Sequence, residues 1–547
     1  MCTEQKKLTL VVIVIMHFVK LKGGDKTAEK EKEKEKQEKK EKSKSAPSLP
    51  PIVYAEVSVQ SVGGVSLFET RELVTSRTVA DFFSEHQLVK SAVSQLRKEG
   101  FEVLQVGPTT ITIGARAEVY ERVFKTKIVP EERDVIKEFN REDTATFLDC
   151  PDTAVPGLID PSKSSLADIL EGVALNEPVY YFASPIPPSV GYWHLDVPDD
   201  VGRALNVKGR ATGRNVKVVM VDTGWYRHPF FDHHGFRANP VVLGPGASDP
   251  DHDEHGHGTG ESANVFAAAP DVDFTMVKMS FVNTVGAFNT AVSLRPDIIS
   301  CSWGYDIRTG PLSASMRTLA AAVANAVHKG IIVIFSAGNG HWAFPGQHPD
   351  VISAGGVFMG ADGSLQATPY ASGFESAIYP GRKVPDVCGL VGLPPKALYI
   401  MLPIEPECTI DRDLSDGTHP NGDETAPDDG WAAFSGTSAA APQLAGVCAL
   451  MKQVWPQLTP AKARDILKRT ARDITKGNCS ARTGGHPAVP GPDLATGHGL
   501  VDASQAKLLT LFVRMLSALP RYTSKLAEEV TKEEMQALED MLLASVD

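Results

Sequence analysis

Short alternating hydrophobic patterns follow a Pro-rich break at residues 47–51. They predict three strands and two helices: strands at residues 53–59, 101–106 and 109–113, and helices at residues 88–98 and 115–124. The simplest packing for this order puts both helices on one face of a small antiparallel sheet. The pattern therefore predicts a small α+β domain over residues 51–130.

Beyond residue 193 the pattern changes to longer apolar runs that alternate with helical stretches. Near-continuous apolar runs are typical of parallel strands that are covered on both faces. Three such runs predict strands at residues 216–221, 297–302 and 331–335. An Ala-rich helix is expected at residues 313–329, where Gly330 ends it. We therefore expect a doubly wound α/β domain with a mostly parallel sheet.

Composition places the boundaries between these parts. Residues 1–50 hold an apolar segment, Leu8 to Met16, and a Lys/Glu-rich stretch at 25–45 that cannot bury a core. Residues 131–190 are acidic and Pro-rich, so we expect a connector there, with a short helix at residues 158–175. The expected division is N-terminal segment and linker 1–50, α+β domain 51–130, connector 131–190, α/β domain 191–505 and C-terminal helices 506–547 (at residues 508–519 and 526–543).

Charge and cysteine content narrow the class of protein. The formal net charge of -12 provides no basic patch, so nucleic acid is not an expected partner. The seven cysteines lack pairing or metal-type spacing, and no disulfide framework follows from them. Lys6 and Lys7 precede the apolar segment, as in a secretory signal, but no small-x-small cleavage site follows. Secretion, membrane anchoring and an unprocessed tail all stay open, and membrane association is undecided.

Candidate chemistry begins with an Asp and a His at the ends of predicted elements. Asp222 ends an apolar strand, where open α/β sheets place their sites, and Gly224 lets the chain turn away. His257 lies just before a helix-forming run at residues 261–268. A neutral imidazole backed by a carboxylate can accept a hydroxyl proton and return it to a leaving amine. Alone, such an Asp is more often a turn or capping residue.

A Ser and an Asn complete the set of candidates. Ser438 lies in the segment 436–442 (GTSAAAP) and opens a predicted helix, because Pro442 is tolerated only in a first helical turn. Its hydroxyl is therefore expected at the N-terminus of this helix, where backbone N–H groups and the helix dipole favour a developing negative charge. Asn339, between two glycines at the end of a strand, is a candidate amide donor to a tetrahedral oxyanion.

The order of these four residues resembles that of the subtilisin-like serine peptidases (subtilases, peptidase family S8), and segment 436–442 is highly specific. The similarity runs over about residues 193–503. It implies that Ser438 is the nucleophile, His257 the general base and acid, Asp222 the orienting carboxylate and Asn339 the oxyanion donor. It also implies a subtilisin-like fold and a serine endopeptidase that hydrolyses polypeptide substrates through an acyl-enzyme.

The same resemblance implies two substrate-binding segments. Ser302, Trp303 and Gly304 align with the strand that pairs with an extended substrate. Ala337 and Gly338 align with the opposite wall of the pocket for the residue before the scissile bond.

The small N-terminal domain resembles the inhibitory prodomains of subtilisin-like and sedolisin-like peptidases over residues 100–124. That resemblance implies a ferredoxin-like prodomain, which acts as an intramolecular inhibitor of a self-processing zymogen. The connector is then the expected place for the processing cut.

Several features depart from the family pattern. The helix after His257 lacks the loop insertion that supplies a tight calcium site in many relatives, so no metal and no cofactor are expected. A loop at residues 249–255 is rich in Asp and His, but we expect a hydrated polar loop there, not a metal site. The loop after Asn339 is shorter than in the prototypes, so substrate preference cannot be carried over.

Three alternatives to an active subtilase stay open. The first is a catalytically silent peptide-binding subtilase scaffold, although all four chemical positions are filled. The second is an α/β-hydrolase esterase, which needs its His and acid after the Ser, unlike the order here. The third is a sedolisin-like enzyme with Glu261 as base, against which the Gly-Thr context of His257 argues.

Overall fold

The structure is a computed structural model that describes residues 48–517, except 71, 138–140, 181–192, 196–198, 210, 361, 393–397, 415–424 and 435. The expected apolar segment and Lys/Glu-rich linker, and the expected helix at 526–543, lie outside the described residues. From Leu49 on, the described residues belong to one compact unit of the chain. None of the helices in the described part is both long and apolar enough to cross a membrane.

The small domain (residues 53–175) is built on a five-stranded antiparallel sheet with the order β2-β3-β1-β7-β6. Its elements are β1 Val53–Val59, η1 Val79–Phe82, α2 His86–Lys98, β2 Glu102–Val106, β3 Ile111–Ala115, α3 Ala117–Phe124, β6 Leu158–Ile159, η3 Pro161–Lys163 and β7 Leu170–Leu175. The strands and helices predicted between residues 53 and 124 are therefore confirmed, each within two residues of its expected ends. Leu96, Tyr120 and Phe124 from the two helices are buried against the sheet in one hydrophobic cluster.

The prediction of a helix at residues 158–175 is wrong. This stretch forms strands β6 and β7, and β7 pairs with β1 in the middle of the sheet. Leu170, Val173 and Leu175 of β7 are buried in the small domain's core, and the register with β1 shifts between Leu170 and Gly172. Gly172 packs so closely on the Phe68 ring that a Cβ atom would lie 2.6 Å from it. The acidic stretch before it is folded too, as a hairpin of β4 Val129–Lys137 and β5 Arg141–Asp149. The described part of the expected connector therefore contains four strands, whose backbone groups are satisfied by the pairing of β4 with β5, β6 with β7 and β7 with β1.

The large domain is built on an eight-stranded sheet with the order β10-β11-β9-β12-β14-β16-β17, in which β20 also pairs with β16. Its strands are β9 Lys217–Asp222, β10 Val242–Leu243, β11 Asp273–Lys278, β12 Ile298–Cys301, β14 Ile332–Ser336, β16 Ile352–Met359, β17 Leu365–Ala367 and β20 Val387–Leu390. All pairs are parallel except β16 with β17. The three predicted parallel strands are confirmed as β9, β12 and β14.

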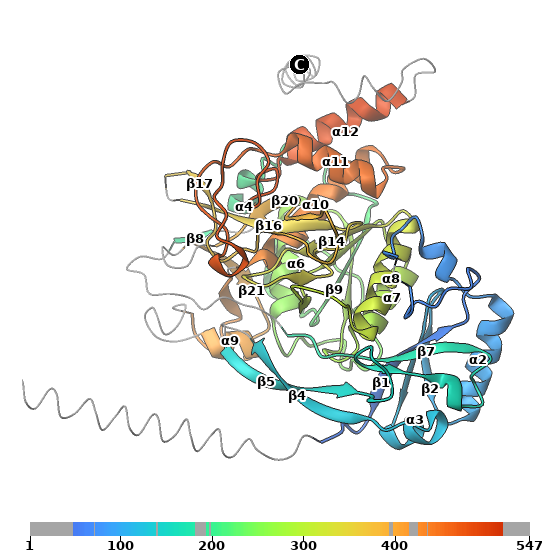
Figure 1. Cartoon of the computed structure of the whole chain (residues 1–547). Helices are drawn as coiled ribbons and strands as arrows, with labels where there is room; N and C mark the ends of the chain where they lie inside the picture. The colour runs from blue at the N-terminus through green and yellow to red at the C-terminus, as the bar shows by residue number, and fades with distance from the viewer. Residues whose placement is uncertain are drawn as a thin grey trace, which may run out of the picture. The chain divides into compact units, whose positions relative to one another are not determined.

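Helices cover both faces of this sheet (Figure 1). Along β9, Val218 and Met220 belong to the hydrophobic cluster that contains residues of α6 (His257–Ala268) and α10 (Thr437–Val454). Val219 and Val221 belong to the opposite cluster, with α7 (Thr284–Ser293) and α8 (Ala314–His328). Strand side chains alternate between faces, so this division confirms a sheet buried on both sides. The predicted helix at 313–329 is α8.

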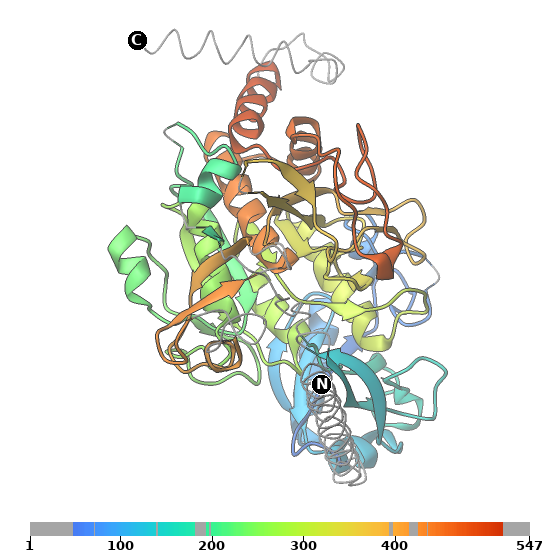
Figure 2. The same ribbon diagram turned by 90° about the vertical axis from the view of Figure 1, so that its left-hand side faces the viewer.

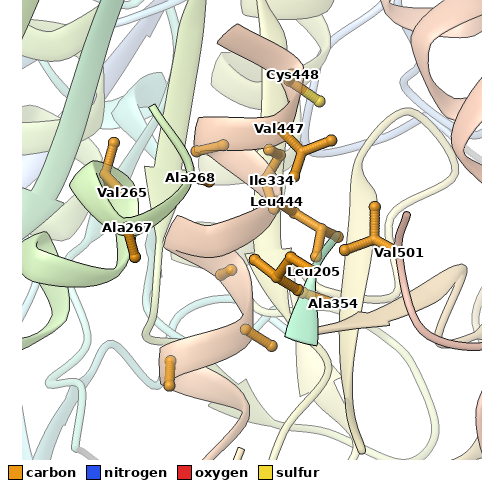
Figure 3. Packing of buried hydrophobic residues seen from close by; sticks show 14 of the residues in the cluster. Leu205, Val265, Ala267, Ala268, Ile334, Ala354, Leu444, Val447, Cys448 and Val501 are labelled. Carbon is orange, nitrogen blue, oxygen red and sulfur yellow. The ribbon is translucent and has the colours of Figure 1, made fainter. Parts of the chain in front are cut away.

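Helix α10 lies at the centre of the larger cluster. Leu444, Val447 and Cys448 of α10 belong to one hydrophobic cluster with Val265, Ala267 and Ala268 of α6 and with Ile334 and Ala354 of the sheet (Figure 3). These side chains are all buried. Gly446 of α10 lets the two helices approach closely, because a Cβ at this position would lie 2.6 Å from the Val265 carbonyl oxygen of α6. The close packing of α6 on α10 therefore fixes the two helices relative to each other.

The remaining elements surround this core. They are β8 Trp193–Leu195, α4 Asp199–Ala204, α5 Pro229–His234, β13 Tyr305–Asp306, β15 Ala343–Phe344, β18 Phe374–Glu375, β19 Lys383–Val384, β21 Leu398–Pro403, α9 Thr409–Leu414, β22 Trp431–Phe434, α11 Pro460–Thr470, η4 Ala481–Thr483 and α12 Ala503–Ser517. The boundary expected after residue 505 falls inside α12, whose residues Ala503, Ala506 and Leu509 pack in the main core. In Figure 2, α12 is the red helix that leads toward the C-terminus.

Candidate active site

Asp222 and His257 form a direct hydrogen bond at the carboxyl end of the sheet. Asp222 is the last residue of β9 and is fully buried. Its Oδ1 accepts the backbone N–H of Thr223 at 2.8 Å and lies 2.8 Å from His257 Nδ1. Because an ionised carboxylate only accepts, Nδ1 carries the proton and Nε2 of the neutral ring is left as the basic nitrogen. The carboxylate thus sets both the tautomer and the orientation of the imidazole.

Side chains from two other segments hold the start of α6, and with it His257. The backbone N–H of Gly258 donates to Thr223 Oγ1 at 2.8 Å. The carboxylate of Asp253 accepts the N–H groups of Gly256 at 3.0 Å and Thr259 at 2.8 Å, and the Thr259 hydroxyl at 2.7 Å. The first N–H groups of a helix need such acceptors because the helix itself supplies none. His257 is therefore held by the helix start as well as by Asp222.

Asp253 was missed at the sequence level, where the loop at residues 249–255 is expected to be hydrated. Asp253 is instead fully buried. Lys278 also stabilises this loop, because its ammonium group donates to the carbonyls of Asp249 and His252 and to Glu254 Oε2. Within the described residues, no group of three or more His, Cys, Asp and Glu side chains is arranged to hold a metal ion. Asp253 caps the start of α6. The sequence signal that could have identified this cap is an Asp four residues before His257 together with a Thr two residues after His257.

Ser438 lies in the first turn of α10, as predicted, and is half-buried. The first-turn position expected for Pro442 is wrong, because Pro442 is the sixth residue of the helix. Proline has no N–H to donate to the carbonyl four residues earlier, which is that of Ser438. Its hydroxyl is 3.3 Å from the carbonyl oxygen of Ser302, and the Ser302 hydroxyl donates to the Ser438 carbonyl at 2.9 Å. Ser302 follows β12, where Cys301 is in register with Val221. One residue further along, Ser302 is therefore the neighbour of Asp222. These contacts place the serine at the same end of the sheet as the Asp-His pair.

Asn339 is attached to the start of α10 by its side-chain oxygen. Asn339 Oδ1 accepts the backbone N–H of Thr437 at 2.9 Å and the Thr437 hydroxyl at 3.0 Å. The Thr437 hydroxyl also accepts the N–H of Gly338 at 3.2 Å. With the oxygen fixed by a backbone donor, the amide nitrogen is the opposite atom of the group, and it lies beside Gly436, where a Cβ would be 3.1 Å away. The donor atom is thus directed along the chain that leads into Ser438.

The expected substrate-binding residues have mostly buried side chains. The Trp303 indole donates to the Val221 carbonyl at 2.8 Å and packs in the hydrophobic core. A Cβ at Gly304 would lie 2.7 Å from the Phe344 carbonyl oxygen, so no side chain fits there. Ala337 is fully buried and its N–H donates to the Ala354 carbonyl. Any contact of Trp303 or Ala337 with a substrate therefore has to come from the main chain.

Glu261, the alternative base, lies one turn after His257 on α6. It is buried, and Asn264 Nδ2 donates to its Oε2 at 2.9 Å. Burial, and secondarily the negative charge of Asp222, raise the pKa of Glu261 well above its ordinary value. Gln443 of α10 donates to Asn264 Oδ1 at 2.9 Å, which extends this polar network between the two helices. Asp222 hydrogen-bonds to His257, which argues for the imidazole as the base.

Comparison with known proteins adds an independent finding. A model of the subtilase family (peptidase S8) matches residues 213–499, more than half of the chain. Alkaline elastase YaB from Bacillus sp. (strain YaB) is 26% identical over 281 residues, which cover 48% of this chain and 61% of that protein. Subtilisin E from Bacillus subtilis (strain 168) is 27% identical over 292 residues, which cover 49% of this chain and 63% of that protein. Proprotein convertase subtilisin/kexin type 7 from Mus musculus is 30% identical over 319 residues, which cover 51% of this chain and 37% of that protein.

Among solved structures, fervidolysin from Fervidobacterium pennivorans, a keratinolytic enzyme related to subtilisin, matches with a TM-score of 0.48 and 16% identity. That match covers 84% of this chain and 62% of fervidolysin. The chain spans about three fifths of the length of the two bacterial relatives named above. The mixed α/β architecture with a largely parallel sheet agrees with the fold class expected from the sequence. Since the family match covers more than half of its residues, the chain belongs to the subtilase family.

Proposed function

We propose that this protein is a serine endopeptidase that uses Asp222, His257 and Ser438 as a catalytic triad, with Asn339 as an oxyanion donor. One observation carries the proposal: the buried 2.8 Å contact between Asp222 and His257, at the end of the sheet where Ser438 opens α10. Family membership supports the same reaction class.

In the proposed reaction, His257 Nε2 takes the proton of the Ser438 hydroxyl as Oγ attacks the scissile carbonyl carbon. The resulting oxyanion is stabilised by the Asn339 amide and by the N-terminus of α10. The imidazolium then gives its proton to the leaving amine, and an acyl-enzyme forms on Ser438. A water molecule hydrolyses this ester by the same steps in reverse order. Asp222 stays ionised and stabilises the positive charge on the ring.

The proposed substrates are polypeptides that bind in extended form. The segment Ser302–Gly304 and the segment Ala337–Gly338 follow neighbouring parallel strands, so their main chains lie on two sides of the proposed site. Main-chain pairing gives affinity with little demand on the substrate's sequence. The closely packed Gly304 supports the view that main-chain atoms line this part of the site.

We further propose that the small domain is the prodomain of a self-processing zymogen. Directly after β7, Asn176 Nδ2 donates to Asn283 Oδ1 at 2.8 Å, and the N–H of Val179 donates to the Phe281 carbonyl at 2.9 Å. Val179 is buried in the large domain's cluster with α7 and α8. The chain thus leaves the small domain's sheet and runs directly along the large domain. This supports a bound inhibitory segment followed by a processing cut in the stretch beyond residue 180.

A second contact supports the same assignment. The loop between β1 and α2 reaches the far end of α8, where Ser76 donates to the Asp350 carboxylate through its N–H at 2.6 Å and its hydroxyl at 3.0 Å. Leu67, Val79 and Phe82 of this loop pack on Ala321 and Ala324. The small domain therefore contacts the large domain at two places, which supports its assignment as an intramolecular inhibitor.

The test uses the purified full chain and three forms of it: parent, Ser438→Ala, and Ser517→Ala as an exposed serine control on α12. We expect the parent and the control to react with a fluorophosphonate probe and to convert to a shorter stable product. Ser438→Ala should do neither, because the nucleophile is absent. A parent protein that fails to label would indicate a silent scaffold. Conversion that persists in Ser438→Ala would refute self-processing.

A further inference from the structure

The turn after β14, residues 337–342, is held by two buried side chains. Gly340 N–H and His341 N–H donate to Ser372 Oγ at 3.0 and 3.1 Å, and Ser372 Oγ donates to the His341 carbonyl at 2.7 Å. The N–H of Asn339 donates to His341 Nδ1 at 3.2 Å. All of these groups are buried. Consecutive backbone donors of this turn are therefore satisfied by side chains, not by a regular element.

The turn needs such support because its backbone is flexible by composition. Gly338 and Gly340, on either side of Asn339, have φ angles of 107° and 89°. Glycine reaches this region at no steric cost, but it also leaves many other conformations open. The ring of His341 and the hydroxyl of Ser372 lie directly behind Gly338, where a Cβ would be 3.0 and 2.9 Å from them. The His341 ring and the Ser372 hydroxyl therefore restrict the backbone conformation of the turn.

The hydrogen bond to Asn339 requires a neutral His341 ring. Nδ1 accepts from a backbone N–H, so it carries no proton, and the tautomer is the one protonated on Nε2. Burial, and secondarily the positive charge of Arg482, lower the pKa of His341 to about 3. The ring therefore stays an acceptor in neutral and alkaline solution. A protonated Nδ1 would direct its hydrogen at the N–H of Asn339.

Two anchors thus act on Asn339, one at its backbone and one at its side chain. His341 holds its backbone nitrogen, and Thr437 holds its side-chain oxygen. The position of the amide nitrogen follows from both, since the side chain leaves from a backbone whose torsions the first anchor fixes. Catalytic donors act best when they are aligned before the reaction begins.

We propose that His341 is a positioning residue for the oxyanion donor: its neutral imidazole holds the backbone of Asn339 so that the amide nitrogen meets the tetrahedral oxyanion. This inference rests on the proposed function. It assigns His341 no contact with the substrate and no proton transfer. Its effect should therefore be seen in kcat and should depend on the presence of Asn339.

The test compares His341→Leu with His341→Asn in the otherwise active protein. Leucine fills much of the space without an acceptor, whereas asparagine places Oδ1 on Cγ, as Nδ1 is in histidine. With rates normalised to active sites by fluorophosphonate titration, we expect His341→Leu to lower kcat on a peptide substrate about 10- to 100-fold, with KM within about threefold. His341→Asn should recover most of kcat. A His341→Leu protein with parental kcat, or one that loses KM instead, would overturn the inference.

A double-mutant cycle separates positioning from general damage. Asn339→Ala alone should lower kcat by roughly 10²- to 10³-fold, a magnitude known from the same kind of donor in subtilisin itself. Adding His341→Leu should then cost little more, because its target is gone. Full multiplication of the two losses would refute the inference. An Asn339→Ala protein with parental kcat would refute it as well and leave the triad proposal standing, whereas activity that survives Ser438→Ala would end the proposed function.

Discussion

Replacing Asp253 by alanine should destabilise the protein and slow catalysis through the start of α6. The Asp253 carboxylate is fully buried and accepts three hydrogen bonds, two from the backbone N–H groups of Gly256 and Thr259 and one from the Thr259 hydroxyl. A hydrogen bond to a charged group contributes about 1.5–3 kcal/mol, and a buried donor left without a partner costs a similar amount. The hydroxyl can turn to another acceptor, but the two N–H groups cannot. We therefore expect a loss of about 3–5 kcal/mol in the free energy of unfolding.

The catalytic effect follows from the position of His257, which is the residue after Gly256. Release of Gly256 lets the first turn of α6 shift, and a misplacement of about 1 Å can cost about 100-fold in rate. We expect kcat/KM of Asp253→Ala to fall by at least about tenfold. Asp253→Asn should have a stability and a kcat/KM between those of Asp253→Ala and the parent, because asparagine keeps one acceptor oxygen.

Urea unfolding measures the first effect, with each variant made in a Ser438→Ala background so that autolysis does not intervene. Asp251→Ala is the matched control, since Asp251 is an exposed residue of the same loop, and it should change stability by less than about 0.5 kcal/mol. If Asp253→Ala matched this control in stability and in kcat/KM, Asp253 would neither stabilise the start of α6 nor position His257.

Three further results are expected. Asp222→Asn should keep the fold but lower kcat by about 10⁴-fold in a peptide assay, because the amide favours the wrong tautomer of His257; a loss below tenfold would contradict this. Burial raises the pKa of Glu177 from 4.5 to about 7, so its contribution to stability is complete below pH 4.5 and is lost as the pH rises through 7. Glu177→Gln should therefore be more stable than the parent at pH 8, by up to about 3 kcal/mol in urea unfolding, and equal to it at pH 4; equal stabilities at pH 8 would be inconsistent with a buried acid. Arg382 donates two hydrogen bonds of 2.7 Å to buried Asp386 and lowers its pKa, which adds stability above the ordinary Asp pKa that is lost on acidification. Arg382→Met should cost about 3 kcal/mol at pH 7 and less toward pH 3, and a cost that does not vary with pH would argue against the ion pair.

Much of the fold could be read from the sequence because local pattern and tertiary environment agree there. Strands such as β9 and β14 are apolar on both faces, which only a doubly covered parallel sheet allows. A helix start at Ser438 was predicted correctly, although Pro442, on which the prediction rested, is the sixth residue of α10 and lies beyond the first turn. The helix predicted at residues 158–175 is wrong because their short apolar pattern fits either a helix or a strand, and pairing with β1 favours the strand.

The order and chemical types of Asp222, His257, Asn339 and Ser438 were present in the sequence, since each stands at the end of an element that its own neighbours define. Only the tertiary structure decided what holds them. The supports of the site, Asp253, Thr437 and His341, accept hydrogen bonds from backbone N–H groups, which no side-chain pattern reveals. Hydrophobic periodicity reports which face of an element is buried, whereas a hydrogen bond between distant segments depends on how these faces pack together.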